Sequence, residues 1–307
     1  MKKILIIKHG SFGDIVLSLH PLFSIKNHFK KSNITVLTES KYKEIFKCLP
    51  FINNIKIDNR AGFFSIVQNF KLILWFKKQK FDWVFDLQTS RRTNIYFFVF
   101  SKLYSFYWSG IAKKCSHPHT NINRKYLHTI DRHRQQLNIS GIKRFIKPDW
   151  SLFISKNNGL NIKKPYVIIV PGGSRHRLSK RWKIENFMEI ISFFSELNFL
   201  TVLVGGSDES SIIKEADEKN LKILNLIGKT TFLDLATLSQ GAIVILGNDT
   251  GPMHFLAASS RKKTKNIILF GNASDPKLCA PVGKNVVILQ KDDINEITPD
   301  EIKNLIN

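Results

Sequence analysis

The sequence predicts an α/β protein made of two domains, each with a parallel β-sheet covered by helices. In both halves of the chain, short apolar runs typical of buried strands alternate with amphipathic stretches typical of helices. Three of the apolar runs end in a turn rich in Gly, Ser or Asp, and a helix pattern begins directly afterwards. Because alternating strands and helices form parallel sheets with right-handed crossovers, we expect one such sheet in each half.

The expected elements follow one another with short connections. In the first half, strands are expected near 3–8, 34–38, 54–57 and 82–86, and helices near 15–29, 41–47, 63–79 and 91–106. In the second half, strands are expected near 166–170, 200–204, 222–225, 242–246, 266–270 and 285–289, and helices near 185–197, 208–219, 232–239 and 251–258. Turn residues and weak periodicity mark 145–165, so we expect domains at 1–155 and 160–307. A capping box at 298–301 predicts a short closing helix.

Length and composition agree with a globular protein of the cytoplasm. The 307 residues, 43% of them hydrophobic, are enough for two cores of ordinary size. No stretch of about 20 apolar residues is present, and the apolar run at 4–7 is too short for a signal peptide. Cys48, Cys115 and Cys279 are scattered without metal-ligand spacing, which indicates reduced thiols.

The net charge of +23 favours a polyanionic partner, such as nucleic acid, an anionic membrane or a phosphorylated glycolipid. Lys, Asn, Ile and Phe are abundant throughout, as in proteins of AT-rich genomes, so part of this charge reflects composition. No paired Cys/His finger and no aromatic RNA-binding signature is present. We therefore expect no nucleic-acid partner.

The most informative segment is 244–254, where an apolar run ends in a polar turn and a helix begins. Thr250 fits the N-cap position, and Pro252 falls in the first turn, where a missing N–H costs little. This places the free N–H groups of a helix N-terminus at the carboxyl end of a strand, where phosphorylated ligands dock in α/β sheets. A purely structural helix cap has the same pattern, and both interpretations stay open.

Two other turns share this arrangement. After the run 166–170, Gly172 and Gly173 allow close backbone approach, and they are followed by cations that suit a diphosphate: Arg175, His176, Arg177, Lys180 and Arg181. At the start of the chain, a strand leads through Gly10 and Gly13 to Asp14 at a helix start. The helix macrodipole favours a carboxylate there, so a capping role for Asp14 is equally open.

These segments, together with others that follow in the same order along the chain, make it resemble the heptosyltransferases that build the lipopolysaccharide core, glycosyltransferase family 9. The matching segments cover nearly the whole chain: Gly13-Asp14, Asp86-Leu87-Gln88, Pro171-Gly172 through Lys180-Arg181-Trp182, Val204-Gly205-Gly206 with Glu209, Leu226 to Thr230, Asn248 to His254, and Leu269-Phe270-Gly271. The opening departs slightly, because the family more often has Ser-Ser-Leu-Gly-Asp where this chain has 10–14. The resemblance implies the GT-B architecture, two Rossmann-like domains facing a central cleft.

Several common motifs are missing from the sequence. It has neither Gly-x-Gly-x-x-Gly after the first strand nor a Gly-x-x-x-x-Gly-Lys-Ser/Thr phosphate loop. It also lacks the Asp-x-Asp pair that holds Mn²⁺ or Mg²⁺ in the other main glycosyltransferase fold. We therefore expect an enzyme with no metal and no cofactor, which offsets leaving-group charge with cations and helix N–H groups.

The resemblance assigns roles to particular residues. Asp14 would be the base that takes the acceptor hydroxyl's proton, which implies inversion at the anomeric carbon, and Lys180 would be the cation facing the departing diphosphate. Asp249 is expected to orient its turn or accept from sugar hydroxyls, and Glu209 to accept from the ribose or simply to start a helix. The donor-binding residues implied in the C-terminal domain are Gly172, Gly173, Ser174, Arg181, Glu209, Lys229, Asp249, Thr250, Gly251, Pro252, Met253 and His254. A solvated surface role for Arg181 and a packing role for His254 remain alternatives.

The acceptor side is expected in the N-terminal domain. An acidic, phosphorylated sugar acceptor would need a cationic cluster, for which the candidates are Arg60, Arg91, Arg92, Arg124 and Arg132, although each arginine also fits a solvated surface. Gly13 is a further candidate for acceptor binding. The aromatic stretch 96–108 is expected to be mostly core helix, with part of it on a membrane interface. The implied enzyme moves heptose from ADP-heptose to a lipid A–Kdo type acceptor, with peripheral contact to the cytoplasmic face of the anionic inner membrane.

Two other functions fit parts of the sequence. A nucleotide-sugar epimerase of the same two-domain architecture would release an altered sugar nucleotide or sugar rather than a glycoside. A polyanion-binding protein without enzymatic activity is favoured by the net charge alone.

Overall fold

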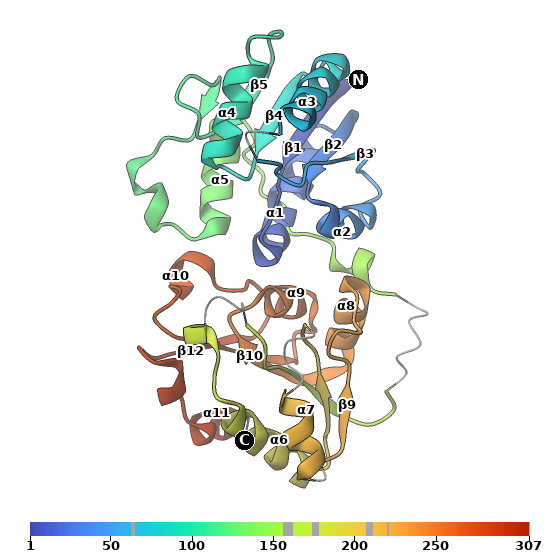
Figure 1. Cartoon of the computed structure of the whole chain (residues 1–307), viewed down its shortest axis with the longest axis vertical. Coiled ribbons are helices and arrows are strands. Elements are labelled where there is room, and N and C mark those ends of the chain that lie inside the picture. The colour runs from blue at the N-terminus through green and yellow to red at the C-terminus, as the bar shows by residue number, and fades with distance from the viewer. Residues whose placement is uncertain (63–64, 156–161, 174–177, 207–210, 220, 307) are drawn as a thin grey trace. The chain divides into compact units, whose positions relative to one another are not determined.

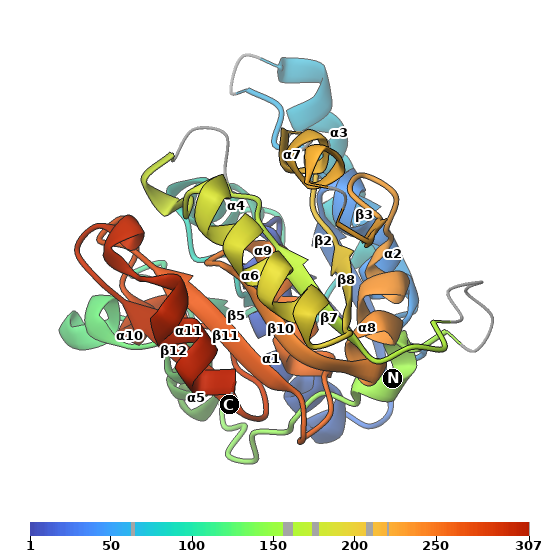
Figure 2. The ribbon, with the colours of Figure 1, turned by 90° about the horizontal axis from the view of Figure 1, so that it is seen from below.

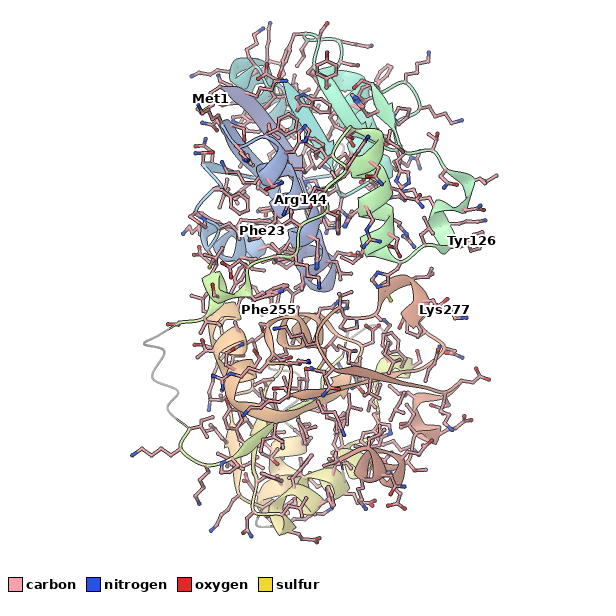
Figure 3. All side chains as sticks on the ribbon, turned by 180° about the vertical axis from the view of Figure 1, so that it is seen from behind. Met1, Phe23, Tyr126, Arg144, Phe255 and Lys277 are labelled. Atoms are coloured by element: carbon pink, nitrogen blue, oxygen red, sulfur yellow. The ribbon has the colours of Figure 1, made fainter. Side chains whose placement is uncertain are left out.

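The computed structural model describes residues 1–62, 65–155, 162–173, 178–206, 211–219 and 221–306. The chain forms two compact units, Met1–Asp149 and Trp150–Asn307 (Figure 1). The expected boundary placed 150–155 in the first domain. In the structure, Trp150 and Phe153 pack against Phe255, which is fully buried inside the second unit (Figure 3). The division therefore falls before these residues.

The first unit holds one parallel sheet in the described residues. Its strands are β1 (Lys2–Ile7), β2 (Ser32–Thr38), β3 (Asn54–Ile57), β4 (Trp83–Asp86), β5 (Tyr107–Gly110) and β6 (His117–Pro118). Its helices are α1 (Phe12–His28), α2 (Lys43–Lys47), α3 (Ile66–Gln79), α4 (Arg91–Phe100) and α5 (Thr129–Ile139), with 3-10 turns at Ser40–Tyr42 and Ile122–Tyr126. The strand order is β3-β2-β1-β4-β5-β6.

The second unit repeats this plan. Its strands are β7 (Tyr166–Val170), β8 (Leu200–Leu203), β9 (Ile223–Asn225), β10 (Ala242–Asn248), β11 (Lys265–Phe270) and β12 (Val286–Gln290). Its helices are α6 (Ile184–Glu196), α7 (Ser211–Glu218), α8 (Phe232–Gly241), α9 (Gly251–Ser259), α10 (Pro276–Cys279) and α11 (Pro299–Ile306), with 3-10 turns at Trp150–Phe153, Leu178–Lys180 and Ile294–Glu296. The order β12-β11-β10-β7-β8-β9 is the same order read from the other edge. Both units thus have the strand order of a dinucleotide-binding sheet.

Helices cover both faces of each sheet, which explains the continuously apolar strands. In the first unit, α3 and α4 share a core with Leu5, Ile7 and Trp108. In the second unit, α6, α7 and α11 cover one face, and α6 and α11 are seen along it in Figure 2. Thr298 and Glu301 form the capping box expected before α11, and the three cysteines form no disulfide.

One expected element is wrong. The helix expected at 91–106 ends at Phe100, and strand β5 begins at Tyr107. Aromatic residues continue without a break across this boundary and pack in one core with Phe76 and Trp108. The continuous apolar run hid the change from helix to strand. Strands β5 and β6 and helices α5 and α10 were not expected at all.

Candidate functional site

Each unit brings its candidate residues to the carboxyl ends of the two central strands. The strand order reverses direction between β1 and β4 and between β7 and β10, and ligands of open α/β sheets bind at such switch points. In the first unit, Lys8 to Asp14 follow β1, and Gln88 follows β4. In the second unit, Gly172 and Gly173 follow β7, and Asp249 follows β10.

Asp14 lies in the first turn of α1, where it caps the helix. Oδ2 of its carboxylate accepts from the backbone N–H of Ser11 at 3.2 Å and from the Ser11 hydroxyl at 3.1 Å. The capping role that the sequence left open is therefore present. Both hydrogen bonds use the same oxygen, so the other carboxylate oxygen lies outside the capping box and a second role for Asp14 remains compatible with the geometry.

Gln88 holds the loop that carries Asp14. Its side-chain oxygen accepts the backbone N–H of His9 at 2.9 Å and that of Gly10 at 3.3 Å. The sequence singled out the segment 86–88 by resemblance without giving Gln88 a role. The structure supplies one, since this amide joins the loop after β1 to the loop after β4.

A buried lysine and a buried aspartate lie beside this loop. Burial lowers the pKa of Lys8, and the negative charges of Asp14 and Asp86 oppose that shift. Burial raises the pKa of Asp86 to about 6, against hydrogen bonds from Thr89 and other donors. Lys8 Nζ lies 3.5 Å from the carbonyl oxygen of Leu87. The Asp14 loop thus follows a buried lysine that interacts electrostatically with Asp14 and Asp86.

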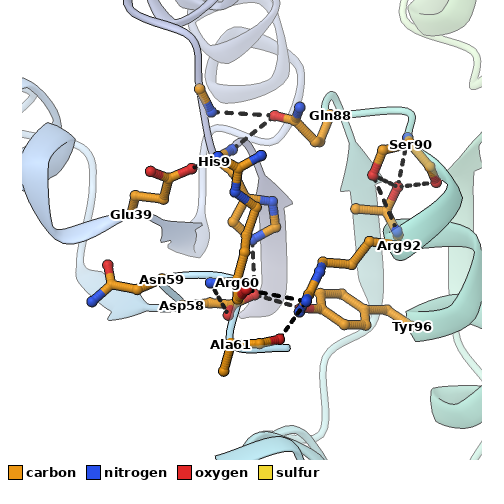
Figure 4. Close-up of polar contacts among 12 residues, drawn as sticks. His9, Glu39, Asp58, Asn59, Arg60, Ala61, Gln88, Ser90, Arg92 and Tyr96 are labelled. Atoms are coloured by element: carbon orange, nitrogen blue, oxygen red, sulfur yellow. Dashed lines mark hydrogen bonds and ion pairs between the residues drawn. The ribbon is translucent and has the colours of Figure 1, made fainter. Parts of the chain in front are cut away.

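Two side chains converge on Asp58, just after β3 (Figure 4). His9 Nε2 lies 2.9 Å from Asp58 Oδ2, and the Tyr96 hydroxyl donates to the same oxygen at 2.6 Å. Burial alone would raise the pKa of Asp58, but the hydrogen bonds from His9 and Tyr96 lower it to about 2. The group therefore stays a carboxylate and ties the ends of β1 and β3 to α4.

Arg60 and Arg92, two of the acceptor candidates, are brought together at this network (Figure 4). Arg92 donates to the Tyr96 hydroxyl at 3.0 Å and to the backbone carbonyls of Arg60 and Ala61. The Arg60 side chain pairs with Glu39 at 2.6 Å and is 48% exposed. Arg92 thus shapes the 60–61 turn, and Arg60 presents its guanidinium at the surface of the unit.

Arg124 and Arg132 form a second group. Arg124 donates to the Thr89 hydroxyl at 2.8 Å and to His119 at 3.2 Å, and burial lowers its pKa, as does the charge of Arg132. Arg132 donates to the backbone carbonyls of Leu127 and Lys125. Of the remaining candidates, Arg91 is exposed at the start of α4, and Gly13 is buried in the first turn of α1.

Asn248, the last residue of β10, organises the second unit's loops. Its Nδ2 group donates to the carbonyls of Pro171 at 2.7 Å and Gly172 at 3.2 Å, and its Oδ1 accepts from the backbone N–H of Trp182 at 3.2 Å. One buried amide thus joins the turn after β7, the basic segment at 180–182 and the end of β10.

Asp249 and Lys180 form an ion pair, with Lys180 Nζ 2.5 Å from Asp249 Oδ2. The Ser274 hydroxyl donates to the same oxygen at 2.7 Å, and His254 Nε2 lies 3.8 Å from Oδ1. Burial would raise the pKa of Asp249, but contacts with His254, Lys180 and Ser274 lower it to about 2. Lys180 is therefore the ion-pair partner of Asp249, a contact that the sequence did not show.

Two buried polar atoms near this pair have no hydrogen-bond partner within the described part of the chain. They are the Thr250 hydroxyl oxygen and Nε of Arg181. Thr250 is the N-cap of α9 and Pro252 lies in its first turn, as expected, but the Thr250 hydroxyl makes no cap bond. Arg181 donates to the Gly173 carbonyl through Nη2 at 2.8 Å. These groups give the α9 N-terminus hydrogen-bonding capacity that the fold does not use.

The other donor candidates are placed as follows. Gly251 and Pro252 open α9, and both are partly exposed. Met253 has no exposed surface and packs beneath Gly247, so its contribution is to packing. Lys229 is exposed and reaches the Asn225 carbonyl at 3.3 Å. Ser174 and Glu209 lie outside the described residues.

Sequence reasoning missed several residues of the first unit's network: His9, Glu39, Asp58, Gln88 and Tyr96. Four of them could have been found, because each stands within two residues of the end of a strand at the same sheet edge. Within the described ranges, no group of three or more His, Cys, Asp or Glu residues could hold a metal ion. None of the described helices is long and apolar enough to cross a bilayer.

Comparisons with known proteins agree on one family. The model of glycosyltransferase family 9 (heptosyltransferase) matches residues 69–304, about three quarters of the chain. Lipopolysaccharide heptosyltransferase 3 of Escherichia coli K12 is 26% identical over 296 residues, covering 90% of this chain and 84% of that protein. Lipooligosaccharide heptosyltransferase 2 of Campylobacter jejuni is 25% identical over 265 residues, covering 84% and 77%.

Solved structures show the same fold. The E. coli ADP-heptose lipopolysaccharide heptosyltransferase II superposes with a TM-score of 0.78 at 18% identity, covering 100% of this chain and 98% of that one. A UDP-GlcNAc 2-epimerase from Methanocaldococcus jannaschii matches less well, with a TM-score of 0.58 at 17% identity over 98% and 93% of the chains. The fold is therefore of the GT-B type, and the E. coli heptosyltransferase matches it better than the epimerase does. The chain belongs to glycosyltransferase family 9, the heptosyltransferase family.

Proposed function

We propose that this glycosyltransferase moves heptose from ADP-heptose to an acidic, lipid-linked core saccharide, without a metal ion and with inversion at the anomeric carbon. Family membership supports the transfer of a sugar from a nucleotide donor. The relatives are named for heptose transfer in lipopolysaccharide or lipooligosaccharide synthesis, which supports the choice of sugar and acceptor. The observation that carries the assignment is the Lys180–Asp249 pair, a cation fixed by a carboxylate beside the N-terminus of α9.

The second unit would hold the donor. Negative charge grows on the diphosphate as the glycosidic bond breaks, so a fixed cation stabilises the transition state more than the ground state. Lys180 supplies the cation, and the first N–H groups of α9 with the Thr250 hydroxyl supply hydrogen-bond donors. Asp249 fixes Lys180 and forms an ion pair with it, so we propose a positioning role for Asp249 in place of direct contact with the phosphates.

The first unit would supply the base and the acceptor site. The oxygen of Asp14 outside the capping box would take the proton of the acceptor hydroxyl as that oxygen attacks the anomeric carbon. Arg60 and Arg124 would bind acidic groups of the acceptor, since Arg60 is half exposed and Arg124 lies beside the loop after β4. Arg92 and Arg132 bond backbone carbonyls and would shape these loops.

The proposed acceptor is anchored in a membrane, so the enzyme would work at the cytoplasmic face of the inner membrane through peripheral contact. The net charge of +23 supports attraction to anionic lipid.

The test is transfer from ADP-heptose to a lipid A–Kdo acceptor, followed by mass spectrometry of the product and NMR of its anomeric centre. We expect one added heptose, equimolar ADP, an inverted linkage and unchanged activity in EDTA. Release of an altered sugar nucleotide or free sugar without acceptor would indicate an epimerase instead. Strict dependence on added Mg²⁺ or Mn²⁺ would contradict the metal-free mechanism.

A further inference from the structure

The outward face of α3 is apolar, although this helix already buries its other face. Leu72 and Phe76 point into the core and are at most 7% exposed. On the opposite side, Ile66 is 76% exposed, Phe70 57% and Leu74 49%, at successive spacings of four residues that place them on one stripe. Val67 beside them is 65% exposed. A helix that only covers a sheet would have polar residues at these positions.

Lysines lie on the same side of α3. At about 100° per residue, Lys77 falls within the arc that carries the exposed apolar residues, Lys71 and Lys78 lie within about 40° of its edge, and all three are exposed. The helix contains no Asp or Glu. Its outward face therefore combines apolar side chains with positive charge.

Helix α4 extends this surface. It packs beside α3 (Figure 1), and its outward residues Ile95 and Phe98 are 37% and 61% exposed. The Lys102 ammonium lies 4.2 Å from the centre of the Phe98 ring. An apolar groove of about 150 Å³ runs between the two helices, lined in part by Ile73, Ile95 and Val99. We call the surface made by Ile66, Val67, Phe70, Leu74, Ile95 and Phe98 the α3–α4 face.

Acidic residues are rare in the segment of the chain that carries this face. Residues 59–130 contain 12 Lys and Arg but only two acids, Asp82 and Asp86, and Asp86 is fully buried. Of the 15 large hydrophobic side chains exposed in the described residues, six belong to the α3–α4 face. Apolar exposure and uncompensated positive charge therefore coincide on one surface, which is the combination that an anionic membrane interface attracts.

We infer that the α3–α4 face docks on an anionic phospholipid bilayer, with its apolar side chains in the interfacial region and its lysines at lipid phosphates. The choice of a bilayer rests on the proposed function, whose acceptor is lipid-linked. Docking would also bring the acceptor loops to the membrane, because α3 follows the loop that carries Arg60 and α4 follows the loop that carries Gln88. Of the 96–108 stretch, which the sequence placed partly at a membrane, Phe98 belongs to this face, whereas Tyr96, Phe100 and Trp108 are buried.

The test is co-sedimentation of the full chain with vesicles of phosphatidylcholine alone or with about one third phosphatidylglycerol. We expect binding only to the anionic vesicles at low salt and its loss by about 0.5 M NaCl, where the Debye length falls well below 8 Å. The variant Lys71→Ser/Lys77→Ser/Lys78→Ser should bind about 100-fold more weakly, since each lysine near the surface accounts for about fivefold. The variant Phe70→Ser/Phe98→Ser should bind about 10-fold more weakly, because two exposed rings lose partial burial in the interface.

Matched variants of the second unit provide the controls. Lys262→Ser/Lys263→Ser/Lys284→Ser removes the same charge from exposed positions, and Leu197→Ser/Ile243→Ser removes two exposed apolar side chains. Both should bind vesicles as the wild type does. Equal weakening in these controls would show non-specific attraction by net charge and overturn the proposal. Unchanged binding in the α3–α4 variants would overturn it as well.

Two further measurements separate the remaining outcomes. If light scattering shows a dimer that Phe70→Ser/Phe98→Ser converts to a monomer while vesicle binding is unchanged, the face joins two copies of the chain and the docking proposal is wrong. Turnover of the same variant on a deacylated, water-soluble acceptor should equal that of the wild type, whereas turnover on acceptor in vesicles should fall. A protein that binds vesicles through this face but transfers no heptose would overturn the proposed function and leave the docking surface in place.

Discussion

The two units share one strand order but differ strongly in charge. The first unit has 27 Lys and Arg against 8 Asp and Glu, a net charge of +19, whereas the second has 20 against 16, a net charge of +4. If the charge came only from base composition, both halves of one gene would share it. The concentration in the first unit therefore indicates selection for an anionic partner on that side, and it favours function over drift as the source of most of the +23.

The arrangement of polar groups at the strand ends also differs between the two units. In the second unit a single tight ion pair, Lys180–Asp249, stands beside a helix N-terminus. In the first unit, Asp58 is held by a histidine and a tyrosine; beside it, Arg92 bonds backbone carbonyls and Arg60 pairs with Glu39. A compact cation beside N–H groups suits a diphosphate, whereas several spread guanidinium groups suit a larger acidic saccharide.

The largest expected effect separates chemistry in the first unit from donor binding in the second. Asp14→Ala should lower turnover by about 10²–10⁴-fold, the usual contribution of a general base. Affinity for ADP, measured by calorimetry, should stay unchanged because the proposed donor residues belong to the other unit. The control Ser11→Ala removes a hydroxyl that donates to Asp14 but keeps the carboxylate, so turnover should stay close to that of the wild type. Near-normal turnover of Asp14→Ala would leave Asp14 as a helix cap alone.

The second largest effect should lower donor affinity as well as turnover. Lys180→Ala removes one charge-assisted contact to the diphosphate, worth about 1.5–3 kcal/mol, so ADP affinity and turnover should each fall by about 10- to 150-fold. Lys229→Ala, which removes an exposed lysine of the same unit, serves as control and should change both much less. If Lys180→Ala lowered turnover but left ADP affinity intact, the donor would not contact this lysine in the ground state.

Acid stability offers a comparison in which the units should behave alike. The pKa of Asp58 and that of Asp249 are each lowered to about 2 from 3.8. A lowered pKa in the folded state stabilises the fold above pH 3.8, and this stability is lost as the pH falls from 3.8 towards 2. Each group should contribute about 2 kcal/mol.

Hydrogen exchange followed by mass spectrometry from pH 6 to pH 2.5 would resolve the two units. Asp58→Asn should reduce the pH dependence of amide protection from exchange in the first unit only. Asp249→Asn should reduce it in the second unit only. Asp300→Asn, at an exposed position, is the control and should reduce it in neither unit. Simultaneous reduction in both units by one variant would mean that they unfold as a single cooperative body.

The smallest effect concerns the acceptor. Arg60 is 48% exposed, so its contact with an acidic sugar should be worth about 1 kcal/mol, and Arg60→Gln should raise the acceptor KM about fivefold. The KM for ADP-heptose should not change. Lys113→Gln removes an exposed charge of the same unit and is the matched control. An equal rise for both variants would mean that general attraction by the unit's charge replaces specific contact at Arg60.

Most strands and helices could be predicted because their signals are local. Runs such as 166–170 and 244–246 are apolar throughout since both sheet faces are covered, and the Thr250 N-cap lies where the helix begins. Helix α5 could not be found in this way. Two of its four buried side chains, His133 and Gln136, are polar, so its inner face shows no continuous apolar period.

The candidate site was predictable only as residue types at strand ends. Lys180 and Asp249 lie 69 residues apart, and Arg92 lies 32 residues from the carbonyl it bonds, so no local pattern shows that they meet. The role of Gln88 depends on the neighbouring strand's loop and is equally non-local. The sequence shows which residues follow a strand and therefore lie at the carboxyl edge of the sheet. Which of these residues contact one another depends on how distant segments pack.

The capping box at Asp14 has a consequence for how this family diverges. Residues that serve chemistry often reduce stability, so a gene copy released from selection for activity commonly gains stability when it loses them. Here the proposed base also closes the capping box of α1 at position N3, and a carboxylate in the first turn stabilises a helix by about 0.3–1 kcal/mol. A duplicate that had lost its substrate would still be under selection to keep Asp14. The presence of this aspartate in a related sequence is therefore poor evidence that the relative is catalytically active.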